Sequence, residues 1–151
     1  MTETIGHWLQ LAARVHRARL AAAIEDLGLF PGQEQVILHL GSHDGITAGD
    51  LAEKLKVRPP TISKTLQRLS AQGLIERRDH ADDARKTTLS LSKEGKKRAE
   101  SLRERIERVE NDILEGLDGK DGKRLRKLLK RVSKSLAAYA LPEADDGDDS
   151  E

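Results

Sequence analysis

The sequence predicts a mainly α-helical protein that carries a small antiparallel β-wing. Three observations lead to this prediction. Apolar residues recur at helical spacing along both ends of the chain. Between these ends, two short helical segments precede two segments that have the alternation and the β-branched residues of strands. The stretch that joins the two strands is charged and has no apolar anchor, as expected of a loop that projects into solvent or onto a partner.

The N-terminal residues have an amphipathic helical pattern from Thr4 to about Leu27. Gly28 is expected to end this helix, because glycine adopts a left-handed backbone without steric cost. After a turn at residues 29–31, a second helix is predicted over roughly Gly32–Ser42. The apolar residues of the first helix approximate a 3.6-residue period: Ile5, Trp8, Leu9, Ala12, Val15, Leu20, Ile24 and Leu27.

Two short helices are predicted in the centre of the chain. The first starts after Thr47, with Asp50 in the position that closes a capping box. Leu51 and Leu55 lie four residues apart and therefore share one face of it. The second begins at Pro59-Pro60, because proline is tolerated in the first turn of a helix. Its apolar stripe consists of Ile62, Leu66 and Leu69.

The outward face of the second short helix carries hydroxyls, an amide and cations, and it has no carboxylate. Such groups contact phosphates and base edges in duplex DNA, and a helix fits the major groove. We therefore predict a recognition helix, for which an ordinary solvated amphipathic helix is the alternative. The predicted DNA contacts are Pro60, Thr61, Ser63, Lys64, Gln67 and Arg68.

The wing is predicted from the residues that follow this helix. Gly73 is expected to end the helix, and residues 74–78 and 86–91 have the pattern of two paired strands. The charged residues 79–85 form the predicted loop between them. The order helix, helix, strand, charged loop and strand is that of a winged helix-turn-helix.

Several residues of this central segment also form one motif: Leu51, Ala52 and Leu55; Thr61-Ile62-Ser63-Lys64 with Leu69; Gly73-Leu74-Ile75 with Arg77 or Arg78; Asp83-x-Arg85; and Leu89-x-Leu91-Ser92-x-x-Gly95. In this motif the chain resembles the MarR family of bacterial transcription regulators. The resemblance implies that Arg85 enters a DNA minor groove and that Asp83 helps to hold the wing, where Lys86 is a further predicted contact. Two departures bear on docking. Pro59-Pro60 stiffens the start of the recognition helix, and Ala84 stands where many relatives carry a second cation.

A long helix is predicted after Ser92, which has the residue type of an N-cap. A glycine-rich turn at 116–122 separates it from a last helix over about 123–140. The long helix has a narrow apolar seam: Leu102, Ile106, Val109, Ile113 and Leu117. Because the apolar seams at the two ends of the chain exceed what a head of about 45 residues can cover, we expect a homodimer with intertwined termini. A monomer that folds its termini into a local bundle is the alternative.

The predicted organisation is one MarR-like domain over residues 1–142. Its winged part covers about 31–92, and its dimerisation helices cover about 4–28 and 92–140. Residues 143–151 form an acidic tail that we expect to be disordered. This tail holds six acidic residues and no Lys or Arg, so its formal charge is −6. Because the whole chain has a formal charge of +1, residues 1–142 carry +7. Residues 46–100 hold 13 Lys and Arg against 8 Asp and Glu, a net +5, as phosphate binding requires.

Composition narrows the class of function. The chain has no Cys, which excludes thiolate catalysis and Cys-type metal sites. Its 2% aromatic content disfavours single-strand binding by stacking. The histidines are scattered, and no nucleotide-binding or hydrolase motif is present, so we expect no metal, no cofactor and no enzyme activity. With no apolar run long enough to cross a bilayer and no signal peptide visible, we expect a cytoplasmic protein without membrane contact.

The predicted function is therefore a regulator that binds double-stranded DNA as a homodimer on a pseudo-palindromic site, acting as a repressor. The resemblance also implies a pocket for a small aromatic or anionic effector that releases it, for which Trp8, His16 and His39 are the candidate residues; ordinary core and interface positions are the alternative for them. The competing function is a helical, dimeric protein-interaction module that does not bind DNA.

Overall fold

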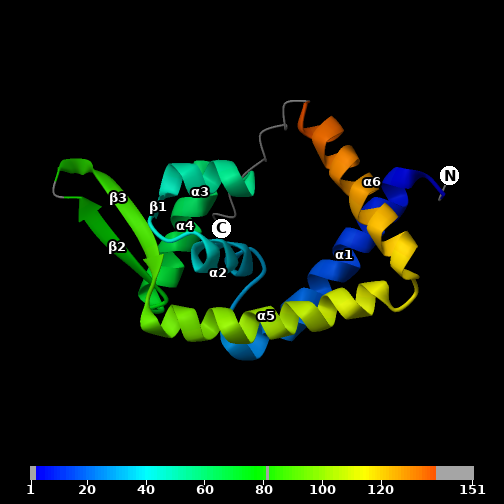
Figure 1. The fold of residues 1–151 in the computed structure, drawn as a ribbon, viewed down its shortest axis with the longest axis horizontal. Coiled ribbons are helices and arrows are strands. Elements are labelled where there is room, and N and C mark those ends of the chain that lie inside the picture. The colour runs from blue at the N-terminus through cyan, green and yellow to red at the C-terminus, as the bar shows by residue number, and fades with distance from the viewer. Residues whose placement is uncertain (1–2, 81, 139–151) are drawn as a thin grey trace, which may run out of the picture. The chain divides into compact units, whose positions relative to one another are not determined.

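The computed structural model describes residues 3–80 and 82–138. It confirms a mainly α-helical fold with a small antiparallel sheet (Figure 1). The elements are α1 (Ile5–Ile24), the 3₁₀ turn η1 (Glu25–Leu27), α2 (Gln33–Ser42), β1 (Ile46–Thr47), α3 (Ala48–Leu55), α4 (Pro59–Ala71), β2 (Ile75–His80), β3 (Asp83–Leu91), α5 (Lys93–Leu114) and α6 (Gly119–Ala137). The chain divides into two compact units, residues 1–110 and 111–151.

The ends of α1 follow from local chemistry. The Thr4 side chain accepts a hydrogen bond from the His7 amide at 3.1 Å, which caps the first turn. The regular helix ends at Ile24 and continues as η1, so the predicted end at Leu27 is reached in the tighter 3₁₀ geometry. Gly28 has φ of +67° and closes the turn, as its residue type predicts.

The two central helices also begin as predicted. The Thr47 hydroxyl accepts from the Asp50 amide at 3.2 Å, which caps the helix, and it donates to the Asp50 carboxylate at 2.8 Å. In α4, Pro59 and Pro60 occupy the first two helical positions, where a missing N–H has no helical partner to lose.

The sheet has the order β1-β3-β2, and both pairings are antiparallel. Ile75 pairs with Leu91, and Ile46 pairs with Leu89, which places one side of the sheet against the core. The short strand β1, which the sequence neither requires nor excludes, is therefore present and extends the two-stranded wing to three strands at its base.

The predicted wing loop over residues 79–85 is wrong in its length. Strand β2 extends to His80 and β3 already begins at Asp83, so most of this stretch lies in strands. Cross-strand side-chain bonds explain the extension: the Thr87 hydroxyl donates to the Asp79 carboxylate at 2.8 Å, and His80 Nε2 lies 3.2 Å from the Thr88 hydroxyl. A ribbon held by its backbone and by polar pairs needs no apolar anchor, which is why the sequence pattern missed it.

The predicted start of the last helix near Lys123 is also wrong. Helix α6 begins at Gly119, because the Asp118 carboxylate accepts from the amides of Lys120 and Asp121, both at 2.8 Å. This N-cap overrides the turn tendency of the glycines that follow. The end predicted near Ala140 and the acidic tail lie outside the described residues.

The core lies in the first unit, beneath the short central helices. Strands, α2, α3, α4 and the first turns of α5 supply most of it, whereas α1 supplies only Leu20 and Ile24. The N-terminal half of α1 is solvent-exposed, with Trp8 55% exposed and Val15 52% exposed. No residue of α6 is buried, and its apolar positions Leu125, Leu128, Leu129 and Leu136 are 37–55% exposed. Within the described residues of their own units, these faces remain uncovered.

Gly95 allows α5 to pack against the start of β2. A Cβ added at Gly95 would overlap the Leu74 carbonyl oxygen and lie 3.0 Å from the Leu74 carbonyl carbon. The same carbonyl accepts from the Ser92 amide at 3.0 Å, while the Ser92 hydroxyl donates to the Gly73 carbonyl at 2.6 Å and accepts from the Gly95 amide at 3.0 Å. The first turn of α5 is thus fixed directly on the end of α4.

Replacing Gly95 by Ala is therefore expected to lower the free energy of unfolding by about 1–3 kcal/mol, the usual cost of overpacking. Gly49→Ala is the matched control, because a Cβ there meets nothing within 4 Å and alanine favours a helix. Urea denaturation followed by circular dichroism would measure both. Equal midpoints for the Gly95 and Gly49 variants would contradict the close packing.

Candidate nucleic-acid interface

Helix α4 presents one buried face and one exposed face. Ile62, Leu66 and Leu69 are at most 2% exposed and pack into the core. The helical period then turns the opposite residues outward. All six residues predicted as recognition contacts lie on that exposed side: Pro60, Thr61, Ser63, Lys64, Gln67 and Arg68. The structure thus brings these six residues together on one surface, and α4 contains no acidic residue.

Arg58 adds a cation that the sequence prediction left out. It is the N-cap residue of α4, is exposed, and makes no side-chain capping bond. Pro59 and Pro60 have no amide N–H, and the Ile62 amide already bonds to the Arg58 carbonyl at 3.1 Å. The Arg58 side chain, together with the helix dipole, is therefore what favours a phosphate at this end. Its position directly before the two prolines was the available signal.

The wing lies at one end of the first unit (Figure 1). Asp83 and Lys86 are exposed in β3, and Arg77 and Arg78 are exposed in β2. The bonds from Thr87 to Asp79 and between His80 and Thr88 stiffen the ribbon near its tip. The backbone of Arg85 belongs to β3, but its side chain lies outside the described part of the structure, so the predicted minor-groove contact stays a prediction.

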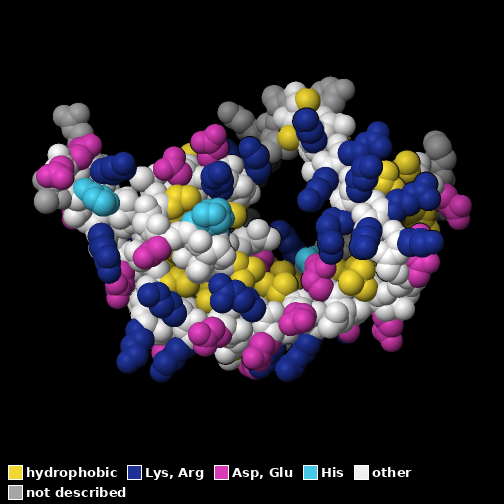
Figure 2. Space-filling model, viewed as in Figure 1, with side chains coloured by type: hydrophobic (Ala, Val, Ile, Leu, Met, Phe, Trp, Pro, Cys, Tyr) yellow, Lys and Arg dark blue, Asp and Glu magenta, His cyan; other side chains and the backbone are white. Residues whose placement is uncertain are grey.

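Positive charge also covers α6, which holds eight Lys and Arg and the single acidic residue Asp121. Figure 2 shows Lys and Arg over most of the visible face of this helix, whereas cations and acids alternate along α5. The wing likewise mixes both signs. Helix α1 also lacks Asp and Glu, so the absence of acids separates α4 from α5 but not from α1. The exposed face of α4 is further distinguished by lying opposite a stripe of three buried residues.

A cavity of about 600 Å³ lies between α1, the turn before α2, and the two central helices. Its walls include His16 and Arg17 from α1 and Thr61 and Thr65 from α4. The cavity therefore adjoins the recognition helix itself. The Glu34 carboxylate, at the start of α2, also lines it and accepts from the Gly32 amide at 2.5 Å. Cationic, hydroxyl and apolar groups together suit a small anionic ligand with an apolar body.

The three residues predicted to form one ligand pocket are not brought together. His16 lines the cavity, but Trp8 is exposed on α1 and packs edge-on against His7, with the ring centroids 5.5 Å apart. His39 stacks on His43, with the centroids 4.5 Å apart, next to a separate hollow that includes Leu38 and Leu55. The pocket was predicted from the resemblance to the MarR family, which does not specify which hollow each of these side chains faces.

The stacked histidines form a pair that the sequence analysis overlooked, because His43 lies just beyond the predicted helix. His39 Nε2 is buried without a hydrogen-bond partner in the described structure. Burial, then the neighbouring His43 and Lys54, lower the pKa of His39 below its usual value of 6.5, because each disfavours the charged ring. No group of three or more ligating side chains that could hold a metal ion occurs among the described residues.

Comparison with known proteins places this fold. Residues 27–86 match the model of the MarR family. The uncharacterized HTH-type transcriptional regulator YwoH of Bacillus subtilis is 27% identical over 108 residues, which are 72% of this chain and 78% of YwoH. A probable transcriptional regulator from Pseudomonas aeruginosa is 29% identical, with a TM-score of 0.79 over 86% of this chain and 97% of the other. MepR of S. aureus, solved in a complex with DNA, has the same fold at 23% identity, with a TM-score of 0.82 over 88% and 98% of the two chains.

The fold and its exposed α4 face define a winged helix-turn-helix regulator. More specifically, residues 27–86 match the MarR family, and the proteins to which the chain is similar are described as transcriptional regulators. None of the helices in the described part of the chain combines the length and the apolar character needed to cross a membrane.

Proposed function

We propose that the protein is a homodimeric transcriptional repressor that binds a pseudo-palindromic site in double-stranded DNA and is released by a small aromatic or anionic ligand. The main support for DNA binding is the exposed face of α4, which has no acidic residue and lies opposite a buried apolar stripe. In this proposal residues 31–92 contact DNA, and the helices within about 4–28 and 92–140 form the dimer. Repression is supported by the similarity to MdtR of Bacillus subtilis, which is an HTH-type transcriptional repressor.

In this proposal α4 enters the major groove with its N-terminal half. Lys64 and Arg68 supply charge for phosphates or guanine edges, and Thr61, Ser63 and Gln67 supply hydrogen bonds to bases or phosphates. Arg58 contacts a phosphate at the groove edge. Arg85 and Lys86 extend from the wing into the neighbouring minor groove, and Asp83 helps to hold the wing.

The exposed apolar faces support a homodimer. Ile5, Trp8 and Val15 lie on α1 and are 52–82% exposed, and the four leucines of α6 are similarly uncovered in their own unit. Apolar faces of this size mark interaction sites. We infer that a second copy of the chain covers these faces. Such a homodimer would also present two α4 helices to duplex DNA with twofold symmetry.

The cavity supports ligand control. Thr61 lines the cavity and also lies on the proposed DNA surface, so a ligand held by His16 and Arg17 would act on the recognition helix directly. A ligand that binds one arrangement of the two heads more tightly shifts the population towards it.

The first test is DNA binding itself. Selection from a random duplex pool should return a symmetric site, and Lys64→Ala should weaken binding to it by about tenfold, or roughly 1.4 kcal/mol, since hydrogen bonds to charged groups are worth at least that. If Lys64 contacts a phosphate, the slope of log affinity against log salt should also fall by about 1. Lys120→Ala, at the start of α6, is the charge-matched control. A chain that prefers no duplex over a random acidic polymer would instead be the interaction module.

The second test concerns the dimer. Leu128→Glu should convert the protein from dimers to monomers in sedimentation, because it places a charge in the proposed apolar interface. Lys127→Glu, on the neighbouring exposed position of the same helix, should leave dimers intact. Single chains in the parent protein at micromolar concentration would exclude the homodimer.

The third test uses benzoate as a probe of the cavity. Millimolar benzoate should weaken DNA binding of the parent several-fold and should have little effect on Arg17→Ala, which loses the carboxylate partner. Arg14→Ala, also on α1 but outside the cavity lining, should respond like the parent. Competition binding by fluorescence anisotropy would measure this. The same loss of affinity in all three proteins, or in none, would reject this cavity as the site for aromatic carboxylates.

A further inference from the structure

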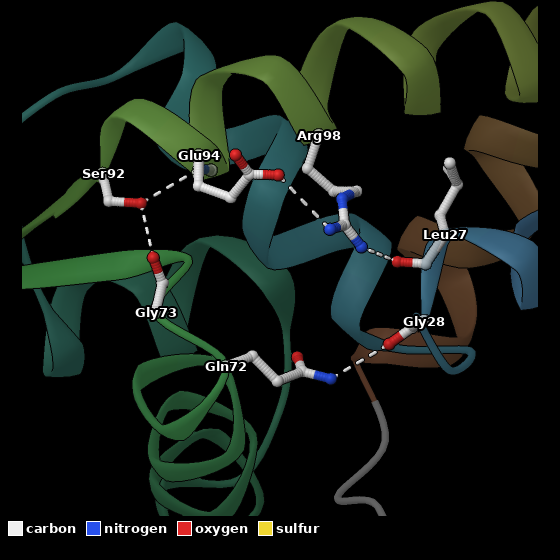
Figure 3. Close-up of polar contacts among 8 residues, drawn as sticks. Leu27, Gly28, Gln72, Gly73, Ser92, Glu94 and Arg98 are labelled. Carbon is white, nitrogen blue, oxygen red and sulfur yellow. Dashed lines mark hydrogen bonds and ion pairs between the residues drawn. The ribbon is translucent and has the colours of Figure 1, made fainter.

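Two adjacent carbonyls at the end of η1 are held by side chains from two distant elements (Figure 3). Gly28 has a left-handed backbone, and its amide donates to the Glu25 carbonyl at 2.9 Å. The helix ends here, so the carbonyls of Leu27 and Gly28 have no amide from a following helical turn as a partner. The Arg98 guanidinium of α5 donates to the Leu27 carbonyl. The amide of the Gln72 side chain donates to the Gly28 carbonyl at 3.0 Å.

Gln72 occupies a special place, because it is the C-cap residue of α4. Its backbone amide bonds to the carbonyls of Arg68 and Ser70, so it is continuous with the recognition helix. The next residue, Gly73, is left-handed, and its carbonyl accepts from the Ser92 hydroxyl at the start of α5. The C-terminal end of α4 is therefore held on one side by α5 and on the other by the end of α1.

The bonds of Arg98 and Gln72 differ in what they connect. Arg98 joins α5 to η1 and also pairs with Glu94 one turn earlier at 3.4 Å, so it fastens two parts of the scaffold. Gln72 joins the recognition helix to the same turn. Its side chain is solvent-exposed, so removing it leaves the buried core intact. In the described structure this bond connects the C-terminal end of α4 to the turn that follows α1.

The length of α4 makes this bond relevant to DNA binding, because a small tilt at one end of the helix moves the other end. Pro60 and Gln72 are twelve residues apart, which is roughly 18 Å along a helix at about 1.5 Å per residue. A tilt of α4 by about 5° about its C-terminal end therefore moves its first turn by roughly 1.5 Å over that length. Two such helices in a dimer would shift together. A displacement of this size is comparable to half the rise of one base pair, about 3.4 Å.

We propose that Gln72 is a positioning residue: its bond to the Gly28 carbonyl fixes the tilt of α4 against the end of α1 and thereby sets the half-site spacing that the dimer accepts. The inference rests on the proposed DNA-binding homodimer, and it deepens that function by naming a determinant of operator spacing. Gln72 itself contacts no base, so its loss broadens the accepted spacing without changing which bases each half-site prefers.

The tilt is measured first without DNA. The chain has no Cys, so spin labels attach only at introduced positions. Labels at Ala22→Cys on α1 and Ser63→Cys on α4, both exposed, report their separation by pulsed electron resonance. Labelled chains are diluted with unlabelled protein, so that only distances within one chain are read. We expect one narrow distribution with Gln72 present and a distribution at least twice as broad with Gln72→Ala.

The spacing is measured second. Affinities are determined for duplexes that carry two identical half-sites at the selected separation and at one and two base pairs more or fewer. In the parent, a shift of one base pair should cost at least tenfold in affinity, and in Gln72→Ala this ratio should fall to threefold or less. Gln72→Arg keeps a donor within reach of the Gly28 carbonyl and should restore the parent's ratio, while its extra charge raises affinity at every spacing alike. Gln67→Ala, on the DNA face, should weaken binding equally at all spacings.

The outcomes separate this inference from the function on which it rests. An unchanged distance distribution in Gln72→Ala overturns the positioning role. A broadened distribution with an unchanged spacing profile overturns the link to operator spacing. If the parent binds no duplex while the distribution still broadens, the proposed function fails, but the control of α4 by Gln72 stands.

Discussion

The contact between the first turn of α5 and the Leu74 carbonyl is the constraint on which the DNA-binding half of the molecule depends. Only a residue without a Cβ fits at Gly95. Ser92 adds hydrogen bonds to the carbonyls of Gly73 and Leu74, the two residues that lie between the end of α4 and β2. One short junction thus joins the recognition helix, the wing and the long scaffold helix. Because these three elements meet within a few residues, a movement of the scaffold is transmitted to α4 and to the wing at the same point.

The molecule separates polar groups that hold the fold from polar groups that remain available. Asp26, Asp50, Asp79 and Asp118 are each engaged by a cation, a cap or a cross-strand hydroxyl. The exposed side of α4 has cations and hydroxyls without any acid to neutralise them. A solvated structural helix gains from mixed charges along its surface, as α5 has. The absence of that mixture on α4, together with its hydroxyl and amide side chains opposite a buried stripe, favours a surface for anions over an ordinary amphipathic helix.

Much of the fold was predictable because it depends on local chemistry. The buried stripe of α4, the Thr47 cap and the Gly28 turn follow from spacing and residue type alone, and the six exposed residues of α4 follow from the stripe. The wing was predicted too short in its strands, because the bonds of Thr87 and Thr88 depend on cross-strand register. The cavity was not predictable from the sequence: the resemblance to the MarR family suggests a pocket near Trp8, His16 and His39, but not that, of these three residues, only His16 lines this cavity. The roles of Gln72 and Arg98 depend on residues 44 and 71 positions away, which no local pattern contains.

The uncovered apolar faces bear on the energetics of the whole chain. Fully burying one Leu, Ile or Val side chain is worth about 1.5–3 kcal/mol, so covering the exposed apolar residues of α1 and α6 is comparable to the 5–15 kcal/mol by which a typical domain is stable. A scaffold of this kind gains much of its stability from whatever covers it. If that cover is a second chain, folding, assembly and the geometry offered to DNA become one coupled equilibrium, and stability depends on protein concentration. In such a system a contact like that of Gln72 with Gly28 need contribute little to stability to have a large effect on function. Its proposed role is to select one tilt of α4. Apolar contacts between the two chains are non-directional and would tolerate several tilts equally well.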